Sequence, residues 1–323
     1  MLLDIAFVVI GLVLILWGAS ALTDGASAIA RRMGVSDLVV GLTVVSFGTS
    51  APELTISIVS SLNDSAGLAV GNVIGSNIFN ICAIIGITAL IRPVPVDRSL
   101  MSNEIPLVVL SSLVLLAMGC GPLLDGAPAA VLTRVDGILL LLFFAVFMRY
   151  VFASAKNGGD ADSHEASPMP VWKAIGMTVL GLAALIWGGD KFVDGAAAIA
   201  AAMGISEAVI GLTVVAVGTS LPELATSVTA ALKGRTGIAV GNVIGSNIFN
   251  IFMVLGAAAT VRQLPFAGIG LPDLLLLTGV SILFWLSGRV IGHNVITRSE
   301  GTVFVVIYVA YMTWVVAGAL NLF

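Results

Sequence analysis

Apolar residues fill ten long segments of this chain, and polar residues separate them. Apolar stretches of about 18 residues or more predict helices that cross a membrane. The segments lie at about 3–31, 36–62, 66–91, 103–121, 128–152, 171–201, 206–232, 236–261, 271–290 and 299–321. The longest polar stretch, residues 153–170, leaves five segments on each side. We therefore predict an all-α polytopic membrane protein with ten transmembrane helices.

The two sets of five helices repeat one sequence. Residues 69–81 read AVGNVIGSNIFNI, and the same letters return at 239–251. Between the motif regions 41–86 and 211–256, roughly 28 of 46 positions are identical, far above chance for a repeat. The last two helices of each set agree only in hydropathy. The predicted organisation is a first repeat at 1–152, a polar linker at 153–170 and a second repeat at 171–323.

The two repeats are predicted to cross the membrane in opposite directions, because five is an odd number of spans. Cytoplasmic loops are enriched in Lys and Arg. With the N-terminus outside, eleven of these residues lie at inner helix ends and three at outer ends. Equivalent loops differ accordingly, since 63–65 reads NDS and 233–235 reads KGR. We predict a plasma-membrane protein with both termini outside and the linker 153–170 in the cytoplasm.

The composition agrees with this picture. The chain is 59% hydrophobic and only 10% charged, whereas soluble domains carry about 25% charged residues. The chain is therefore expected to lie in a lipid bilayer. The sequence has no basic face that would indicate nucleic-acid binding. Cys82 and Cys120 are interpreted as small apolar residues rather than a disulfide. The first helix is interpreted as a transmembrane helix of the protein rather than a cleaved signal peptide. The sequence does not determine the oligomeric state, and a monomer is compatible with it.

Each repeat contains a helix that its own residues should break. Residues 48–53 read GTSAPE and residues 218–223 read GTSLPE. Proline lacks an N–H and disfavours a helical conformation in the residue before it. We therefore predict breaks in helices 2 and 7, deep in the membrane. A break frees backbone carbonyls, expected here around residues 46–49, and these must be buried in protein or line a wet cavity.

A glutamate follows each break, Glu53 in the first repeat and Glu223 in the second. A charged residue at the bilayer centre costs about 2.5–3.5 kcal/mol on insertion scales. Two such residues in equivalent positions indicate a bound cation. The alternative is a structural role, with protonated or hydrogen-bonded side chains that pack between helices.

A polar helix face accompanies the glutamates. Asn72, Ser76 and Asn80 are four residues apart, so they share one face of a helix. The second repeat supplies Asn242, Ser246 and Asn250. Folding the repeats about a pseudo-twofold axis would bring these oxygens to the carboxylates. The absence of Cys and His from this set disfavours zinc and copper. Calcium, with about 6–8 oxygen ligands, and sodium both suit it. The alternative for Asn80 and Asn250 is hydrogen bonding between helices.

The duplicated GTSxPE and GNVIGSNIFNI blocks resemble the α-repeats of the cation/calcium exchanger superfamily, which includes the sodium/calcium exchangers. The resemblance covers helices 1–3 and 6–8. It implies that sodium or proton entry drives calcium out, and that helices 1 and 6 form a sliding gating pair. It assigns the ion ligands to Glu53, Glu223, Thr49, Thr219, Ser50, Ser220, Ser76, Ser246, Asn80, Asn250 and the backbone oxygens of Ser46 and Ala216.

The expected function is an antiporter that exchanges calcium for sodium by alternating access. A proton-coupled antiporter of calcium or another divalent cation is the first alternative. A cation channel or a transport-dead calcium sensor is the alternative of a different class. No enzyme is expected, because no nucleophile–base pair accompanies the carboxylates, and no cofactor is expected besides the transported ions. Potassium-dependent members carry aspartate at one of the Asn80 and Asn250 positions, so we predict no potassium requirement.

Overall fold

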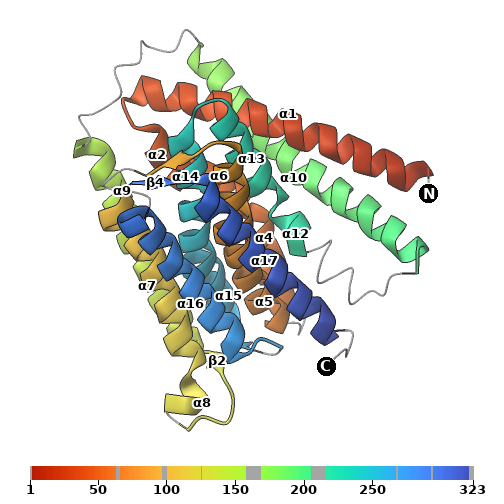
Figure 1. Cartoon of the computed structure of the whole chain (residues 1–323), viewed down its shortest axis with the longest axis vertical. Coiled ribbons are helices and arrows are strands. Elements are labelled where there is room, and N and C mark those ends of the chain that lie inside the picture. The colour runs from red at the N-terminus through yellow and green to blue at the C-terminus, as the bar shows by residue number, and fades with distance from the viewer. Residues whose placement is uncertain are drawn as a thin grey trace.

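A computed structural model describes residues 2–62, 66–96, 100–124, 126–157, 169–204, 216–266, 268–291 and 294–319, and nearly all of them are helical (Figure 1). The elements of the first repeat are α1 (Leu2–Met33), α2 (Asp37–Val40), η1 (Gly41–Val45), α3 (Ser46–Thr49), α4 (Ala51–Leu62), α5 (Ala66–Ile78), η2 (Phe79–Ile84), α6 (Ile85–Ile91), β1 (Val94–Pro95), η3 (Leu100–Glu104), α7 (Ile105–Gly119), α8 (Gly121–Leu124), β2 (Val131–Leu132) and α9 (Arg134–Asn157). The elements of the second are α10 (Val171–Ala202), α12 (Ala216–Thr219), α13 (Leu221–Leu232), α14 (Thr236–Ile248), η5 (Phe249–Leu255), α15 (Gly256–Val261), β3 (Leu264–Pro265), α16 (Leu271–Leu286), η6 (Ser287–Ile291), β4 (Val295–Ile296) and α17 (Arg298–Ala319). Segments labelled η are π-helical.

The predicted polytopic, helical architecture is confirmed. Within the described residues, eight helices are long and apolar enough to cross a membrane. The stretch from α2 to α4 adds a ninth span, which bends by 44° between Thr49 and Ala51. The helix predicted at 206–232 is described only from Ala216 onwards, as α12 and α13, and its earlier part lies outside the described residues. The count of ten helices therefore stays a prediction.

The fifth helix differs from its predicted bounds of 128–152, because α9 begins at Arg134 and ends at Asn157. The preceding residues form strand β2, and Thr133 caps the helix through bonds from its N–H and hydroxyl to Asp136 Oδ2 at 2.8 and 2.7 Å. The apolar pattern cannot locate such a cap. Residues 153–157 are helical too, and 158–168 lie outside the described residues, so the bounds of the linker stay a prediction.

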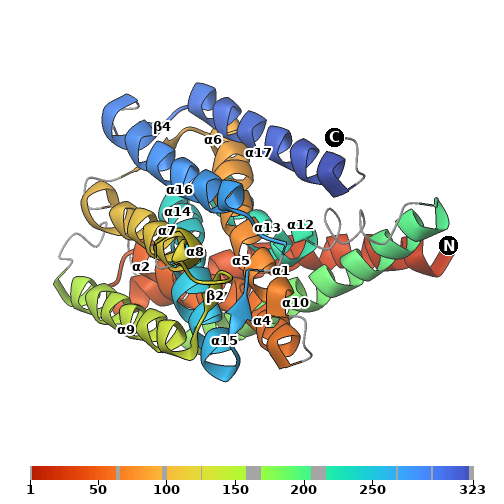
Figure 2. The ribbon, with the colours of Figure 1, turned by 90° about the horizontal axis from the view of Figure 1, so that it is seen from below.

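The two repeats are interlocked, since the last helix of each packs on the third helix of the other (Figure 2). α17 lies against η2 and α6, and α9 lies against η5 and α15. Two antiparallel strand pairs, β1 with β4 and β2 with β3, also join the repeats, because each pair takes one strand from each repeat. A Cβ at Gly301 would lie 2.8 Å from the Gly86 carbonyl oxygen, and one at Gly137 would lie 2.8 Å from that of Gly256. Glycine therefore permits both close contacts.

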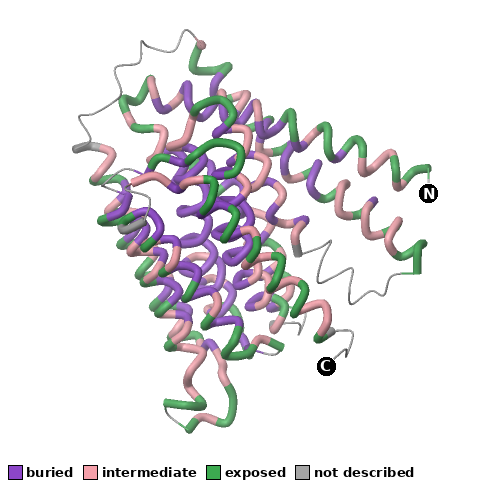
Figure 3. Tube along the Cα trace, viewed as in Figure 1, coloured by how far each residue is buried: buried purple, intermediate pink, exposed green. Residues whose placement is uncertain are grey.

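Helices α1 and α10 form a long pair along one side of the bundle, while the buried residues concentrate around α5, α6, α14 and α15 (Figures 1 and 3). The pair is antiparallel and in close contact. A Cβ at Gly11 would lie 2.6 Å from the Gly188 carbonyl oxygen, and one at Gly18 would lie 2.7 Å from that of Gly181. Because α1 and α10 are equivalent helices of the two repeats, their antiparallel packing is what an inverted repeat requires.

Candidate ion-binding site

Both glutamates follow a break in a helix. In the first repeat α3 ends at Thr49, and Ser50 (φ −85°, ψ 8°) leaves the helical conformation before α4 begins. In the second, Ser220 has nearly the same backbone angles (φ −95°, ψ 7°) between α12 and α13. Proline follows two residues after each of these serines and begins a new helix without needing an N–H partner. The predicted break in helix 2 is therefore present, and the described part of helix 7 contains the same break.

Glycine at each break admits the long helix α10. A Cβ at Gly48 would collide with the Leu182 side chain, and a Cβ at Gly218 would collide with Val193. Leu182 and Val193 are both residues of α10, eleven positions apart. The two breaks therefore face one helix of the α1–α10 pair, which links the candidate gating helix directly to the site.

The two glutamates are held by serines from opposite repeats. Ser50 donates to Glu223 Oε1 at 2.9 Å, and Ser220 donates to Glu53 Oε1 at 3.2 Å. Ser76 also donates to Glu53 Oε1, at 3.4 Å, and its hydroxyl oxygen lies 3.1 Å from that of Ser220. The repeats thus complete one another's carboxylate sites in a reciprocal pattern.

Several oxygen atoms of this cluster have no hydrogen-bond partner among the described residues. Glu53 and Glu223 are fully buried, and the Oε2 atom of each lacks a partner. The same is true of Asn250 Oδ1 and of both polar atoms of the Asn80 amide. Burying an ionised carboxylate without compensation is very costly. These unpartnered oxygens are therefore candidate ligand atoms for a cation.

The remaining predicted ligands lie at the same breaks. Ser246 donates to Glu223 Oε1 at 3.5 Å. Thr49 is fully buried and donates to Asn242 Oδ1 at 3.0 Å. Thr219 is partly buried at the end of α12, and Ala216 is the first residue of that helix. The structure thus gathers the predicted residues at one place, and their role as ion ligands stays a prediction.

The expectation of freed carbonyls needs one correction, at Ser46. Its carbonyl oxygen accepts the Ser50 N–H at 3.0 Å, and the Thr49 hydroxyl oxygen lies 3.4 Å from it. The reason is the helical spacing, because the N–H that Pro52 lacks would have bonded the carbonyl four residues earlier, that of Gly48. Any contact of the Ser46 oxygen with an ion would use its remaining lone-pair capacity.

The sequence pattern missed the π-helical segments at the site. Asn80 and Asn250 each occupy the second position of such a segment, in η2 and η5. π-helical turns are rare and frequently occur at functional sites. A spacing of four residues predicts a shared helix face but carries no signal for a π-turn, so only the structure shows that the asparagines lie on altered backbone.

One end of the bundle is closed over this cluster. α1 packs against α13 there, with Ala26 and Ala230 in the buried apolar cluster between them. Lys233 pairs with Asp24 of α1 at 2.7 Å and donates to the Ser20 carbonyl at 3.1 Å. On the opposite side of the site, α10 carries Asp190 and Asp194, both exposed.

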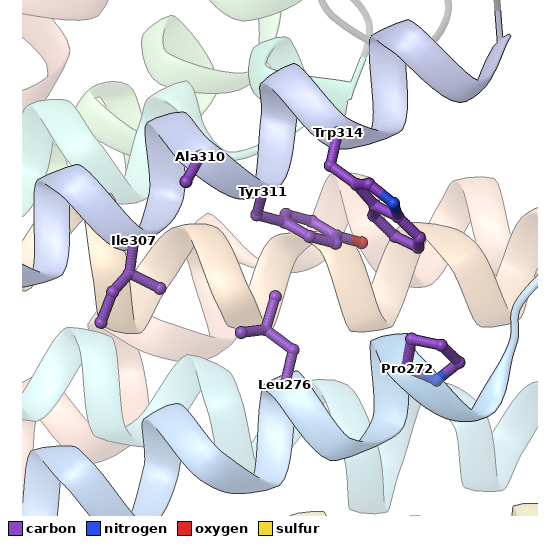
Figure 4. Close-up of a pocket in the computed structure, with 6 residues that line it drawn as sticks. All are labelled: Pro272, Leu276, Ile307, Ala310, Tyr311 and Trp314. Atoms are coloured by element: carbon purple, nitrogen blue, oxygen red, sulfur yellow. The ribbon is translucent and has the colours of Figure 1, made fainter. Parts of the chain in front are cut away.

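A groove of about 340 Å³ elsewhere is a poor candidate for an ion (Figure 4). It lies between α16 and α17 and is lined by Pro272, Leu276, Ile307, Ala310, Tyr311 and Trp314. Its polar side-chain groups are the Tyr311 hydroxyl, which donates to Asp273 Oδ1 at 3.0 Å, and the Trp314 indole N–H. Because an indole N–H donates only and the other lining side chains are apolar, the groove lacks the set of oxygen ligands that a cation needs.

A multi-pass bundle of interlocked repeats, with buried carboxylates at broken helices, has the architecture of a secondary transporter. The family model described as "Sodium/calcium exchanger protein" matches residues 3–153 and 173–317. The chain therefore belongs to the sodium/calcium exchanger protein family.

Relatives of the chain are similar over nearly its full length. The putative antiporter CaxA of Alkalimonas amylolytica is 38% identical, over 96% of this chain and 98% of its own. The sodium/calcium exchanger MaX1 of Methanosarcina acetivorans is 32% identical, over 94% of this chain and 95% of its own. The structure superposes on that of the sodium-calcium exchanger NCX_Mj, soaked with Na⁺ and Ca²⁺, with a TM-score of 0.84 and 33% identity, covering 97% of this chain and 98% of that one.

Proposed function

We propose that this protein is a secondary active antiporter that exchanges calcium for sodium across the membrane by alternating access. The observation that carries the proposal is the pair of fully buried carboxylates, Glu53 and Glu223, each with one oxygen that lacks a partner. The names of two relatives that are similar over nearly the whole chain, the sodium/calcium exchanger MaX1 and the putative antiporter CaxA, support it. In this proposal both cations are the transported substrates.

The ligand chemistry of the cluster suits both ions. Calcium takes about 6–8 oxygen ligands. The two carboxylates balance the charge of one calcium ion, and the asparagine amides supply neutral oxygens. Sodium needs less charge, and the hydroxyls of Ser50 and Ser220 are the kind of neutral ligand that it accepts. Because both ions need the same carboxylates, they exclude one another. The empty, charged cluster is costly to bury, so either ion load favours the change of conformation.

The closed end of the bundle is the cytoplasmic end in this proposal. The Lys and Arg residues at this end include Lys233 and Arg235, and cytoplasmic ends are enriched in such residues. The structure then has its site closed toward the cytoplasm. The same orientation places both termini outside and the 153–170 segment in the cytoplasm of a cell whose plasma membrane holds the protein.

Calcium-45 uptake into proteoliposomes tests the proposal. We expect uptake when the vesicles are loaded with sodium, and uptake at background level in Glu53→Gln and Glu223→Gln. Glu104→Gln is the matched control, because Glu104 is also a buried acid with one unpartnered oxygen, but it lies at the start of α7 rather than at a helix break, and its other oxygen accepts the Tyr150 hydroxyl at 2.7 Å. This variant keeps an acceptor for the tyrosine and is expected to transport normally.

The competing functions predict different results in the same assay. Uptake driven by a proton gradient and indifferent to sodium would indicate a proton-coupled antiporter. Flux that does not saturate and needs no counter-ion would indicate a channel. Calcium binding without uptake under any gradient would indicate a sensor. If the purified protein neither binds nor takes up calcium, the proposed function is wrong.

A further inference from the structure

Two equivalent asparagines near the site make different hydrogen bonds. Asn77 and Asn247 occupy the same position in the two repeats, and both are buried. The side-chain nitrogen of Asn77 donates across to the backbone carbonyl of Asn247 at 3.2 Å. The side-chain nitrogen of Asn247 instead donates to the Val243 carbonyl of its own helix, at 2.7 Å. Asn77 therefore bridges the repeats, while the amide nitrogen of Asn247 is used locally.

The oxygen of Asn77 also fixes the amide of Asn250. Asn250 Nδ2 donates to Asn77 Oδ1 at 3.0 Å. An asparagine amide has a donor side and an acceptor side. With the donor side bound, the buried Oδ1 of Asn250 is the side left without a partner among the described residues. The orientation of this amide is thus set by a contact outside the ligand set.

Asn250 lies on elements that pack beside those of both glutamates. Asn250 lies in η5, which packs against α4, the helix that carries Glu53. It is also four residues after Ser246, which donates to Glu223 Oε1 at 3.5 Å. The equivalent residue Asn80 differs, because neither of its polar atoms has a partner among the described residues. Its amide is therefore not fixed in the way that Asn250 is.

We propose that Asn77 is a positioning residue, which holds the Asn250 amide with its oxygen toward bound calcium. The inference rests on the proposed function, because it takes calcium to bind at this cluster. Without the acceptor on Asn77, the Asn250 amide is free to turn and to present its NH₂ group to the cation. Loss of a group that orients a metal ligand typically weakens metal binding by about 10–100-fold. We expect a loss of at least about tenfold in calcium affinity when Asn77 is replaced.

Equilibrium binding of calcium-45 to the purified full-length protein is the test. Asn77→Leu is expected to raise the calcium Kd by about tenfold or more. Asn247→Leu, the matched control, removes a bond within one helix and is expected to bind like the wild type. Unchanged binding in Asn77→Leu, with binding lost in Glu53→Gln, would overturn the inference and leave the proposed function intact. No binding by the wild type would overturn the proposed function itself.

A double substitution separates positioning from general packing. In Asn250→Asp both side-chain oxygens accept, so no NH₂ group can turn toward the cation. One of these oxygens then faces the Asn77 Oδ1 acceptor, so adding Asn77→Leu removes a repulsion and is expected to leave the calcium Kd level or lower. A tenfold loss that persists in this background would mean that Asn77 acts through packing, and the inference would be wrong. If Asn77→Leu does not give a monodisperse protein, Asn77→Ala removes the same acceptor without added bulk and takes its place in both comparisons.

Discussion

One glycine of the duplicated motif offers a sharp test of how the site is packed. Gly245 of α14 is buried against the first half of helix 2, and a Cβ there would lie 2.8 Å from Ser46 Cβ and 2.9 Å from the Leu42 carbonyl oxygen. The Leu42 oxygen is a backbone atom, and the position of Ser46 Cβ is fixed by the backbone. Neither atom can therefore move away by a change of side-chain rotamer. Gly245→Ala therefore forces α14 away from the helix that carries Ser46 and Thr49.

The expected size of this effect follows from two opposing terms. Overpacking a tight contact costs about 1–3 kcal/mol. Replacing glycine by alanine inside a helix returns about 0.5–1 kcal/mol. Gly245→Ala should therefore destabilise the protein by about 1–2 kcal/mol, the difference between these central values. Gly279→Ala is the control, because Gly279 is exposed inside α16 and no described atom lies within 4 Å of its added Cβ. It should be neutral or stabilising.

Thermal denaturation in one detergent, at one fixed calcium concentration, compares the two variants. We expect the apparent Tm to fall by about 2–8 °C in Gly245→Ala, on the scale of about 2–4 °C per kcal/mol usual for chains of 150–250 residues. The Tm of Gly279→Ala should stay level or rise. Calcium affinity should fall only in Gly245→Ala, because Ser46 and Thr49 move with the displaced helix. If Gly245→Ala melts no lower than Gly279→Ala, the close contact is not a feature of the protein in solution.

Two further predictions concern the closed end and the ions. Lys233→Met removes the ion pair between Lys233 and Asp24 of α1. A partly exposed pair contributes up to about 1 kcal/mol, so its loss should raise the population of the conformation in which this end is open by up to about fivefold. A maleimide should label a cysteine at position 231 correspondingly faster, whereas Lys191→Met, which loses a pair within α10, should leave labelling unchanged. Potassium should not stimulate transport by the purified protein, because Asn80 and Asn250 are both uncharged, and potassium-dependent flux would contradict this reading of the site.

The breaks and the glutamates were predictable because their causes are local. Pro52 acts on the residues beside it, and Glu53 stands out in any apolar run. The bond from Ser50 to Glu223 was not predictable, since it joins residues 173 positions apart. Spacing within a helix identifies which residues share a face. It does not identify which oxygen of which carboxylate a hydroxyl meets on the other repeat.

The last two helices of each repeat show a different limit. Their sequences agree only in hydropathy, yet the structure places equivalent contacts on them. Tyr150 of α9 donates to Glu104 at 2.7 Å, and Tyr311 of α17 donates to Asp273 at 3.0 Å. In both repeats an acid near the start of the fourth helix meets a tyrosine near the end of the fifth. The similarity of the two repeats therefore extends further in structure than in sequence. Each repeat has an acid–tyrosine hydrogen bond between its last two helices, but the residues that form it are not at equivalent positions in the aligned sequences.

The two ends of the bundle are not equivalent, and this bears on the energetics of exchange. α1 and α10 are in close glycine contact, so in the proposed alternating access we expect the movement that releases α1 from α13 to carry α10 toward α4. At the closed end the packing partners are Ala230 and Ala231, both fully buried. Their equivalents in the first repeat are Ser60 and Ser61. Ser61 is already buried and donates to the Ser57 carbonyl at 2.6 Å, whereas Ser60 is only partly buried. Closing the other end would therefore bury further hydroxyl surface at Ser60 alone, where the present conformation buries the methyl group of Ala230. Differential ion binding must supply the free energy that reverses the observed conformation.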